Sequence, residues 1–276
     1  MEAQALRRDA DNKTSKKNFR TGELTDACRG YSTDKGPWDG NRHGYTFIYD
    51  RILPDLQPKK IVEIGLARRG SGASTELSDR RVNHAPSVDF WRTAFPEAHM
   101  VGFDISDFSG LDIENFTFVQ GNAGSDQDIQ NLTAVAQNAD LVVDDGSHAT
   151  RHQLLAMKYL FEALRPGGCY VIEDLNWQPK DIENKNDQGF TTADALTRVK
   201  RGMPLTEKMS AFVPTCLDHV SADEIDLFAH KDILKAGIQC KALFWKERMG
   251  VAARLAKAWV RRDDDVKLAV ITKRGD

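Results

Sequence analysis

The chain of 276 residues carries 38 basic and 41 acidic side chains, which gives a formal net charge of −3. A content of 41% apolar and 29% charged residues excludes a disordered, collagen-like or coiled-coil protein and fits one α/β domain with a sizeable core. The balanced charge gives no support for a nucleic-acid binder, and no apolar run approaches the ~20 residues of a membrane helix, so we expect neither partner. Four scattered cysteines without a C-x-x-C pair, and an N-terminus without the apolar segment of a secretory signal, favour the reducing cytoplasm.

The N-terminal third is expected to contain an arm, a loop and a helix. Residues 1–25 are polar and show no sustained hydrophobic period, so we expect 1–30 to be a mobile arm that contains at most one short helix, and 31–276 to form a single domain. Glycine, proline, aspartate and asparagine in 31–44 predict a loop. The spacing of apolar residues over 45–56 predicts a helix, which Pro58 ends.

Short apolar runs then alternate with segments of helical period. The runs at 60–66, 99–105, 117–120, 140–143 and 169–172 predict buried parallel strands, and the segments 88–94, 126–137 and 150–164 predict helices. This alternation predicts an α/β fold with a doubly wound, mostly parallel sheet.

The last hundred residues give a weaker pattern. The polar stretch 176–214 predicts an irregular lid over the strand ends. Strands are expected at 225–229 and 266–272, with a basic helix at 244–260 between them. Such a helix most simply packs on the body and leaves its charged face in solvent; the less common alternatives are that it holds an anionic acceptor, a membrane surface or a partner subunit.

Two features at the ends of predicted strands indicate a ligand that contains adenosine. The segment EIGLA, with Glu63, Gly65 and Ala67, ends the first strand, where small residues let the backbone turn sharply and approach a ligand. Asp104 ends the second strand, from which a carboxylate accepts hydrogen bonds from ribose hydroxyls in doubly wound folds. These features do not distinguish NAD from S-adenosylmethionine.

Acidic residues follow the fourth and the fifth predicted strands, 140–143 and 169–172. Asp144 and Asp145 come after one strand, and Glu173 and Asp174 after another. The carboxyl ends of neighbouring strands meet at one crevice, where carboxylates repel each other unless a cation or protons lie between them. Oxygen ligands suit Mg²⁺ or another divalent ion, and His148 is placed to take a proton from a substrate hydroxyl. The structural alternative is that these carboxylates cap helices or pair with arginines.

The sequence resembles the class I S-adenosylmethionine-dependent methyltransferases. More closely, it is similar to the metal-dependent sugar O-methyltransferases of macrolide and related natural-product biosynthesis. The resemblance runs over residues 31–177 and depends on the segments YSTDK (31–35), HGY (43–45), EIG (63–65), WRTAFP (91–96), GFDI (102–105), VDDGSH (143–148) and PGGCYVIED (166–174).

The resemblance implies a role for each matching residue. Asp145, Glu173 and Asp174 would bind Mg²⁺, and His148 would deprotonate the acceptor hydroxyl. The implied partner is a small hydroxylated acceptor, a sugar or a sugar-bearing metabolite, and association of several copies is conceivable. The implied S-adenosylmethionine site comprises Glu63 and Gly65 at the methionine part, Asp104 at the ribose, Asn122 near the adenine, and Ala67 and Asp144.

Three alternatives stay open at this point. An NAD-dependent oxidoreductase could use the same sheet. Ala67 and Arg69 stand where many relatives carry glycine, and Asn122 stands where relatives usually carry an acidic residue, so a non-catalytic subunit that binds an adenosine ligand is a second alternative. Chemistry other than methylation at the same cofactor site is the third.

Overall fold

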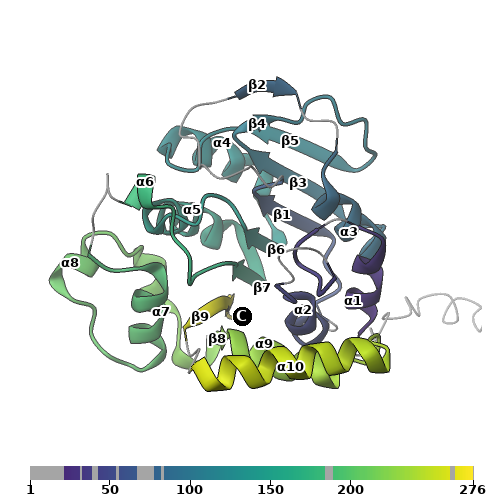
Figure 1. Ribbon diagram of the computed structural model, residues 1–276. Coiled ribbons are helices and arrows are strands. Elements are labelled where there is room, and N and C mark those ends of the chain that lie inside the picture. Colours follow the sequence, from purple (N-terminus) through teal and green to yellow (C-terminus); the bar gives the residue numbers. More distant parts are fainter. Residues whose placement is uncertain are drawn as a thin grey trace, which may run out of the picture.

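The computed structural model describes residues 22–31, 33–38, 43–53, 56–66, 78–81, 84–183, 189–261 and 265–275. A seven-stranded sheet runs through the described part in the order β5-β3-β1-β6-β7-β9-β8 (Figure 1). Its strands are β1 (Lys60–Ile64), β3 (His99–Asp104), β5 (Phe116–Gln120), β6 (Ala139–Asp144), β7 (Leu164–Ile172), β8 (Ile225–Ala229) and β9 (Val266–Thr272).

The first five of these strands are parallel, and β9 is antiparallel to both of its neighbours, β7 and β8. After β1 the chain builds outward through β3 and β5, then returns to place β6 on the other side of β1. The strand order therefore reverses between β1 and β6, which is where open α/β sheets bind ligands. The predicted doubly wound, mostly parallel sheet is confirmed.

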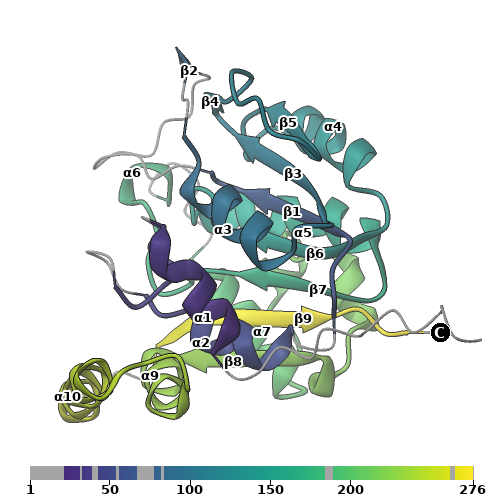
Figure 2. The ribbon, with the colours of Figure 1, turned by 90° about the vertical axis from the view of Figure 1, so that its right-hand side faces the viewer.

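Helices cover both faces of the sheet (Figure 2). One face packs against α4 (Asp126–Ala136), α5 (Thr150–Ala163) and α7 (Thr192–Lys200). The layer on the other face consists of α1 (Glu23–Ala27), α2 (Thr46–Ile52), α3 (Pro86–Ala94) and α9 (His230–Gln239), and α10 (Trp245–Arg261) packs on α9. Side chains alternate along a strand, so Val142 joins the first layer while Leu141 and Val143 join the second. Strands buried on both faces explain the continuous apolar runs in the sequence.

Within the expected arm, residues 23–30 form the short helix α1 and the 3₁₀ turn η1 (Cys28–Gly30), and α1 packs against α2 and α3 instead of extending from the domain. Leu24, Thr25 and Cys28 are buried there. Asp50 of α2 holds this segment, because its carboxylate accepts hydrogen bonds from the Leu24 amide at 2.8 Å and the Thr25 hydroxyl at 2.6 Å. Residues 1–21 of the expected arm lie outside the described residues.

The predicted irregular stretch 176–214 is helical over much of its described length. It contains α6 (Lys180–Glu183), α7 and α8 (Glu207–Ser210), and α7 packs beside α5 and β8. Thr191 begins α7, since its hydroxyl accepts from the Asp194 amide while the Asp194 carboxylate accepts from the Thr191 amide. The remaining elements are a short parallel pair, β2 (Ser78–Arg81) with β4 (Ser106–Asp107), and the 3₁₀ turns η2 (Thr215–His219) and η3 (Ala222–Glu224).

None of the described helices combines the length and the apolar character that crossing a bilayer requires.

Candidate functional site

Gly65 brings the loops after β1 and β6 into contact. Its φ is +85°, and a Cβ at this position would lie 2.2 Å from the Asp145 carbonyl oxygen. The Asp145 amide in turn donates to the Ile64 carbonyl at 2.9 Å. Only glycine fits this backbone, so the glycine turn predicted from the sequence sets the distance between the two strand ends.

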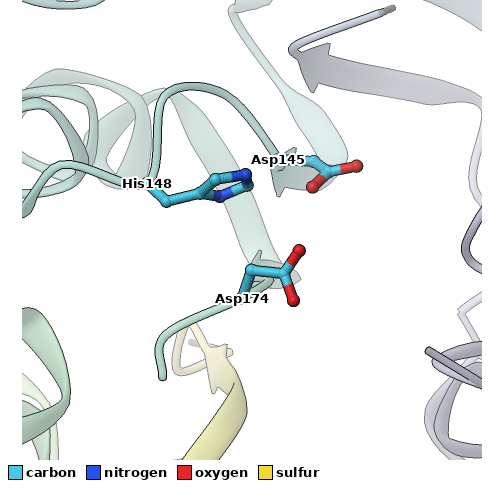
Figure 3. Close-up of side chains that lie close together, drawn as sticks. All are labelled: Asp145, His148 and Asp174. Carbon is cyan, nitrogen blue, oxygen red and sulfur yellow. The ribbon is translucent and has the colours of Figure 1, made fainter. Parts of the chain in front are cut away.

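Asp145, His148 and Asp174 converge at these strand ends (Figure 3). One ligand atom from each residue lies within 4.8 Å of the others. His148 and Asp174 have φ values of +59° and +53°, in the left-handed region that non-glycine residues rarely adopt. Such backbone strain is characteristic of functional sites, where the surrounding structure holds a side chain in a required direction.

The His148 imidazole is partly buried beside Asp145 and Asp174. Its Nδ1 atom is buried and has no hydrogen-bond partner among the described residues. The ring meets Trp177 edge to face, with 5.4 Å between the ring centroids. A buried ring nitrogen without a partner can bind a metal ion or accept a proton from a substrate.

Asp174 is surrounded by donors and cations. The Tyr45 hydroxyl donates to Asp174 Oδ1 at 2.5 Å, and His43 Nδ1 and Lys267 Nζ lie 3.4 and 3.7 Å from the same oxygen. Burial opposes ionisation, but His43, His148 and Lys267 outweigh it and lower the pKa of the Asp174 carboxyl. Asp174 is therefore held as an anion that faces the cluster.

Lys35, a residue of the predicted loop 31–44, is a buried cation at these strand ends. Its ammonium lies 2.7 Å from Asp145, 2.9 Å from Glu173 and 3.2 Å from Glu63, and its side chain has no exposed surface. Burial favours the neutral amine, yet these carboxylates raise the pKa of Lys35 well above its ordinary value. The carboxylates of Glu63, Asp145 and Glu173 come from three strand ends and require a counterion. The lysine of the segment YSTDK was the sequence signal that could have identified this counterion.

Glu173, the third predicted metal ligand, lies outside the cluster of three. Tyr49 donates to its Oε1, and Lys35 donates to its Oε2 at 2.9 Å. Burial and the nearby Asp145 raise the pKa of Glu173 well above its ordinary value, although Lys35 opposes this. The cluster thus contains two of the three predicted metal ligands, Asp145 and Asp174, and its third member is His148.

The residues present fit a divalent cation. Four carboxylates share the ammonium groups of only two lysines at this end of the sheet. Carboxylate oxygens and an imidazole nitrogen are donors that such ions accept. The groups counted are Glu63, Asp145, Glu173 and Asp174 against Lys35 and Lys267.

The predicted cofactor residues Glu63 and Asp104 are both buried at strand ends. Glu63 Oε1 accepts from Trp91 Nε1 at 3.2 Å and lies 3.2 Å from the Lys35 ammonium. Asp104 accepts from the amides of Leu66 and Ser106 at 2.9 and 2.7 Å. Its carboxylate therefore also ties together the loops that follow β1 and β3.

The other predicted cofactor residues are engaged locally or lie outside the described residues. Asn122 Oδ1, expected near the adenine, accepts from the Gly124 amide at 2.8 Å and closes a turn. The Asp144 carboxylate accepts from the Tyr170 hydroxyl at 3.5 Å and from the Gly146 amide at 3.4 Å, and burial raises the pKa of Asp144 to about 6. Ala67 lies outside the described residues.

Comparison with known sequences finds sugar O-methyltransferases. No protein-family model matches the chain. The chain is 34% identical over 167 residues to 8-demethyl-8-(2-methoxy-alpha-L-rhamnosyl)-tetracenomycin-C 3'-O-methyltransferase of Streptomyces olivaceus. It is 31% identical over 155 residues to mycinamicin VI 2''-O-methyltransferase of Micromonospora griseorubida. These alignments cover 56% and 55% of this chain but only 37% and 36% of the relatives, so the chain spans little more than a third of their length.

Comparison with solved structures finds the same fold. The MycE methyltransferase from the mycinamycin biosynthetic pathway, in complex with Mg and SAH, matches with a TM-score of 0.56 and 20% identity. The match covers 94% of this chain and 56% of that one. The same methyltransferase in complex with Mg, SAH and mycinamycin VI gives equal values. The chain therefore has the class I methyltransferase fold, and its sequence is similar to sugar O-methyltransferases of macrolide and tetracenomycin pathways.

Proposed function

We propose that the protein is an S-adenosylmethionine-dependent O-methyltransferase that uses Mg²⁺ or another divalent cation. Its acceptor is a hydroxyl of a small molecule, a sugar or a glycosylated natural product. The observation that carries this proposal is the convergence of Asp145, His148 and Asp174 at the point where the strand order reverses. The names of the sequence relatives and the MycE complex with Mg and SAH support it.

Asp145 and Asp174 are the proposed metal ligands. Glu173 joins them while keeping its contacts with Lys35 and Tyr49, because each carboxylate oxygen has a second lone pair. A divalent cation at this position lowers the pKa of a hydroxyl that it binds. Lys267 and the Tyr45 hydroxyl keep Asp174 ionised and fixed in direction.

His148 is the proposed base. Its unpartnered Nδ1 atom accepts the proton of the acceptor hydroxyl, and Trp177 limits rotation of the ring. S-adenosylmethionine supplies a methyl group on a sulfonium, whose transfer depends mainly on orientation. We assign this orientation to Glu63 and Gly65 at the methionine part of the cofactor and to Asp104 at the ribose, with Ala67, Asn122 and Asp144 as the other proposed cofactor residues.

We also propose a cytoplasmic location. All four cysteines lie in the described part of the chain as buried thiols that form no disulfide with one another, and a reducing compartment keeps thiols in this state. Release of the protein by osmotic shock with periplasmic markers would contradict this location.

Calorimetry tests the cofactor and the metal together. We expect protein stripped with a chelator to bind S-adenosylhomocysteine, and added Mg²⁺ to give a separate saturable signal that Asp145→Ala abolishes. NAD in place of S-adenosylhomocysteine gives no signal. Cofactor binding without a metal signal would remove the metal from the proposal, and absence of both would favour another use of the fold.

Replacement of His148 tests the base. With an acceptor that the unchanged enzyme methylates, His148→Ala lowers kcat by about 10²-fold to 10⁴-fold and leaves binding of S-adenosylhomocysteine nearly unchanged, because a general base acts only in the chemical step. Turnover is followed by release of S-adenosylhomocysteine from a panel of glycosides. Undiminished turnover would remove His148 from the mechanism.

A further inference from the structure

Helix α10 is large but has little contact with the rest of the protein. Of its 17 residues only Val251 and Ala258 are buried. Its main neighbour is α9, and Figure 2 shows it end-on at the periphery, beyond α9. Figure 1 shows that it runs along one edge of the molecule, so a flat surface could touch it over its whole length.

The outward side of α10 is apolar. Ten large hydrophobic side chains are exposed in the described part, and six belong to α9, α10 and the turn between them, so exposure of this kind is concentrated here. Val260 is 86% exposed, Trp245 74% and Trp259 61%. Trp245, Met249, Ala256, Trp259 and Val260 fall on one side of a 3.6-residue helix, and we call these five residues the outer stripe.

Basic residues border the outer stripe. Lys246 and Lys257 are both exposed and lie on the same flank, since eleven residues make about three turns. Arg261 is exposed at the end of the helix. Glu247, the acidic residue of α10, is bonded to Arg29 at 2.8 Å, so it does not offset these charges on the outward side. An exposed apolar patch marks an interaction surface, and a basic border specifies an anionic partner.

We propose that α10 binds the surface of an anionic lipid bilayer, with the outer stripe at the boundary between headgroups and acyl chains. Lys246, Lys257 and Arg261 then lie at the level of the lipid phosphates. Tryptophan and cationic side chains on one helix are typical of helices that lie in this interface. This revises the sequence-based expectation of no membrane partner, which rested on the absence of a spanning segment; a helix that lies on the surface needs none.

A second copy of the chain fits this side less well. Two α10 helices packed antiparallel about a twofold axis would place the flank with Lys246 and Lys257 against the same flank of the other copy. Like charges there repel each other, whereas an anionic bilayer converts the same charges into attraction. The charge pattern therefore favours lipid over self-association.

Vesicle sedimentation tests the proposal. We expect the full chain to bind vesicles that contain phosphatidylglycerol, to bind pure phosphatidylcholine vesicles far more weakly, and to be released by salt. The double variants Trp259→Ser with Val260→Ser, and Lys246→Glu with Lys257→Glu, lower binding at least about tenfold. Phe212→Ser, which changes a residue 47% exposed outside α10, leaves binding unchanged.

Three results would overturn the proposal. These are equal binding to neutral and anionic vesicles, undiminished binding by the stripe variant, and no binding at all. Light scattering identifies the alternative occupant. If the protein does not bind lipid but forms a dimer, and if the variant Trp259→Ser with Val260→Ser dissociates that dimer, the outer stripe binds a second copy of the chain. Retained binding of S-adenosylhomocysteine or an unchanged thermal transition shows that each variant is folded.

Discussion

The His152 imidazole links the free energy of unfolding to pH. It extends from α5 to the Ser147 hydroxyl, 2.7 Å from Nδ1, and lies against Gly124, where a Cβ would come within 2.4 Å of Nε2. Burial, with Arg151 nearby, lowers the pKa of His152 from 6.5 to about 4. The folded protein thus holds a neutral ring under conditions in which the unfolded chain takes up a proton.

Acidification should therefore destabilise the protein through His152. As the pH falls from the unfolded pKa of 6.5 toward the folded value of about 4, only the unfolded state gains a proton, so stability that is complete above pH 6.5 is lost. Between about pH 7.5 and about pH 5 this costs about 2 kcal/mol. In urea titrations over this interval, the His152→Gln variant should lose about 2 kcal/mol less stability than the unchanged protein. The His84→Gln variant, changed at an exposed site, should match the unchanged protein. An equal loss in all three proteins would contradict this account.

The residues of the site differ in how far the sequence could predict them. Asp145 and Asp174 could be found because each lies two residues after the end of a predicted strand, and parallel strands end at the same edge. His148 follows in the same loop as Asp145. The role of Lys35 could not be found in this way, since it lies in a loop 110 residues from Asp145 and 138 from Glu173. Loop residues have no period, so their partners depend on the whole fold.

At the scale of elements, the Glu247 side chain joins α10 to two segments near the N-terminal end of the described chain, at Arg29 and at Trp38. Glu247 accepts from Arg29 at 2.8 Å and from Trp38 Nε1 at 2.9 Å, and the Arg29 guanidinium lies 4.2 Å from the Trp38 ring centroid. Arg29 follows α1, and Trp38 belongs to the loop that carries Lys35. Glu247 thus connects the periphery of the protein to the loop at the site.

Removal of this connection should have a moderate cost. Glu247→Ala should lower the free energy of unfolding by about 1–2 kcal/mol, because it removes a partly exposed ion pair and leaves the indole N–H unpaired. Glu247→Gln, which still accepts a hydrogen bond, should cost less than half as much. Asp226→Ala, which removes the exposed pair with Lys200, serves as the control at under about 0.5 kcal/mol. Urea denaturation measures all three, and equal losses for Glu247→Ala and Asp226→Ala would disprove the connection.

Elements with strong periods were predicted well, and short ones were not. β1, β3, β5 and β6 and the helices α3, α4 and α5 agree with their predicted ranges to within about two residues at each end, because buried runs and apolar periods mark them directly. β7 begins at Leu164, five residues before its predicted start. The five-residue helix α1 gives no period, and its burial depends on Asp50. Helix α9 was not predicted, although Ile233 and Leu234 pack in the core.

At the scale of the whole molecule, the sequence predicts the kind of sheet but not its complete order. The alternation of strands and helices requires parallel neighbours, which β1, β3 and β6 provide. The position of β9 between β7 and β8 has no such local signal. It arises from pairing between residues about a hundred positions apart, such as Cys169 with Thr272.

The buried Lys35 ammonium has a consequence for how the protein is made and stored. Because the ammonium groups of Lys35 and Lys267 already lie against the carboxylates at the strand ends, we expect the polypeptide to fold without an inorganic ion. Ions can then come and go with their supply in the surroundings, unlike a structural zinc that is built in for the life of a protein. Intact protein should thus be recoverable from metal-poor medium and be loaded afterwards with whichever ion is chosen.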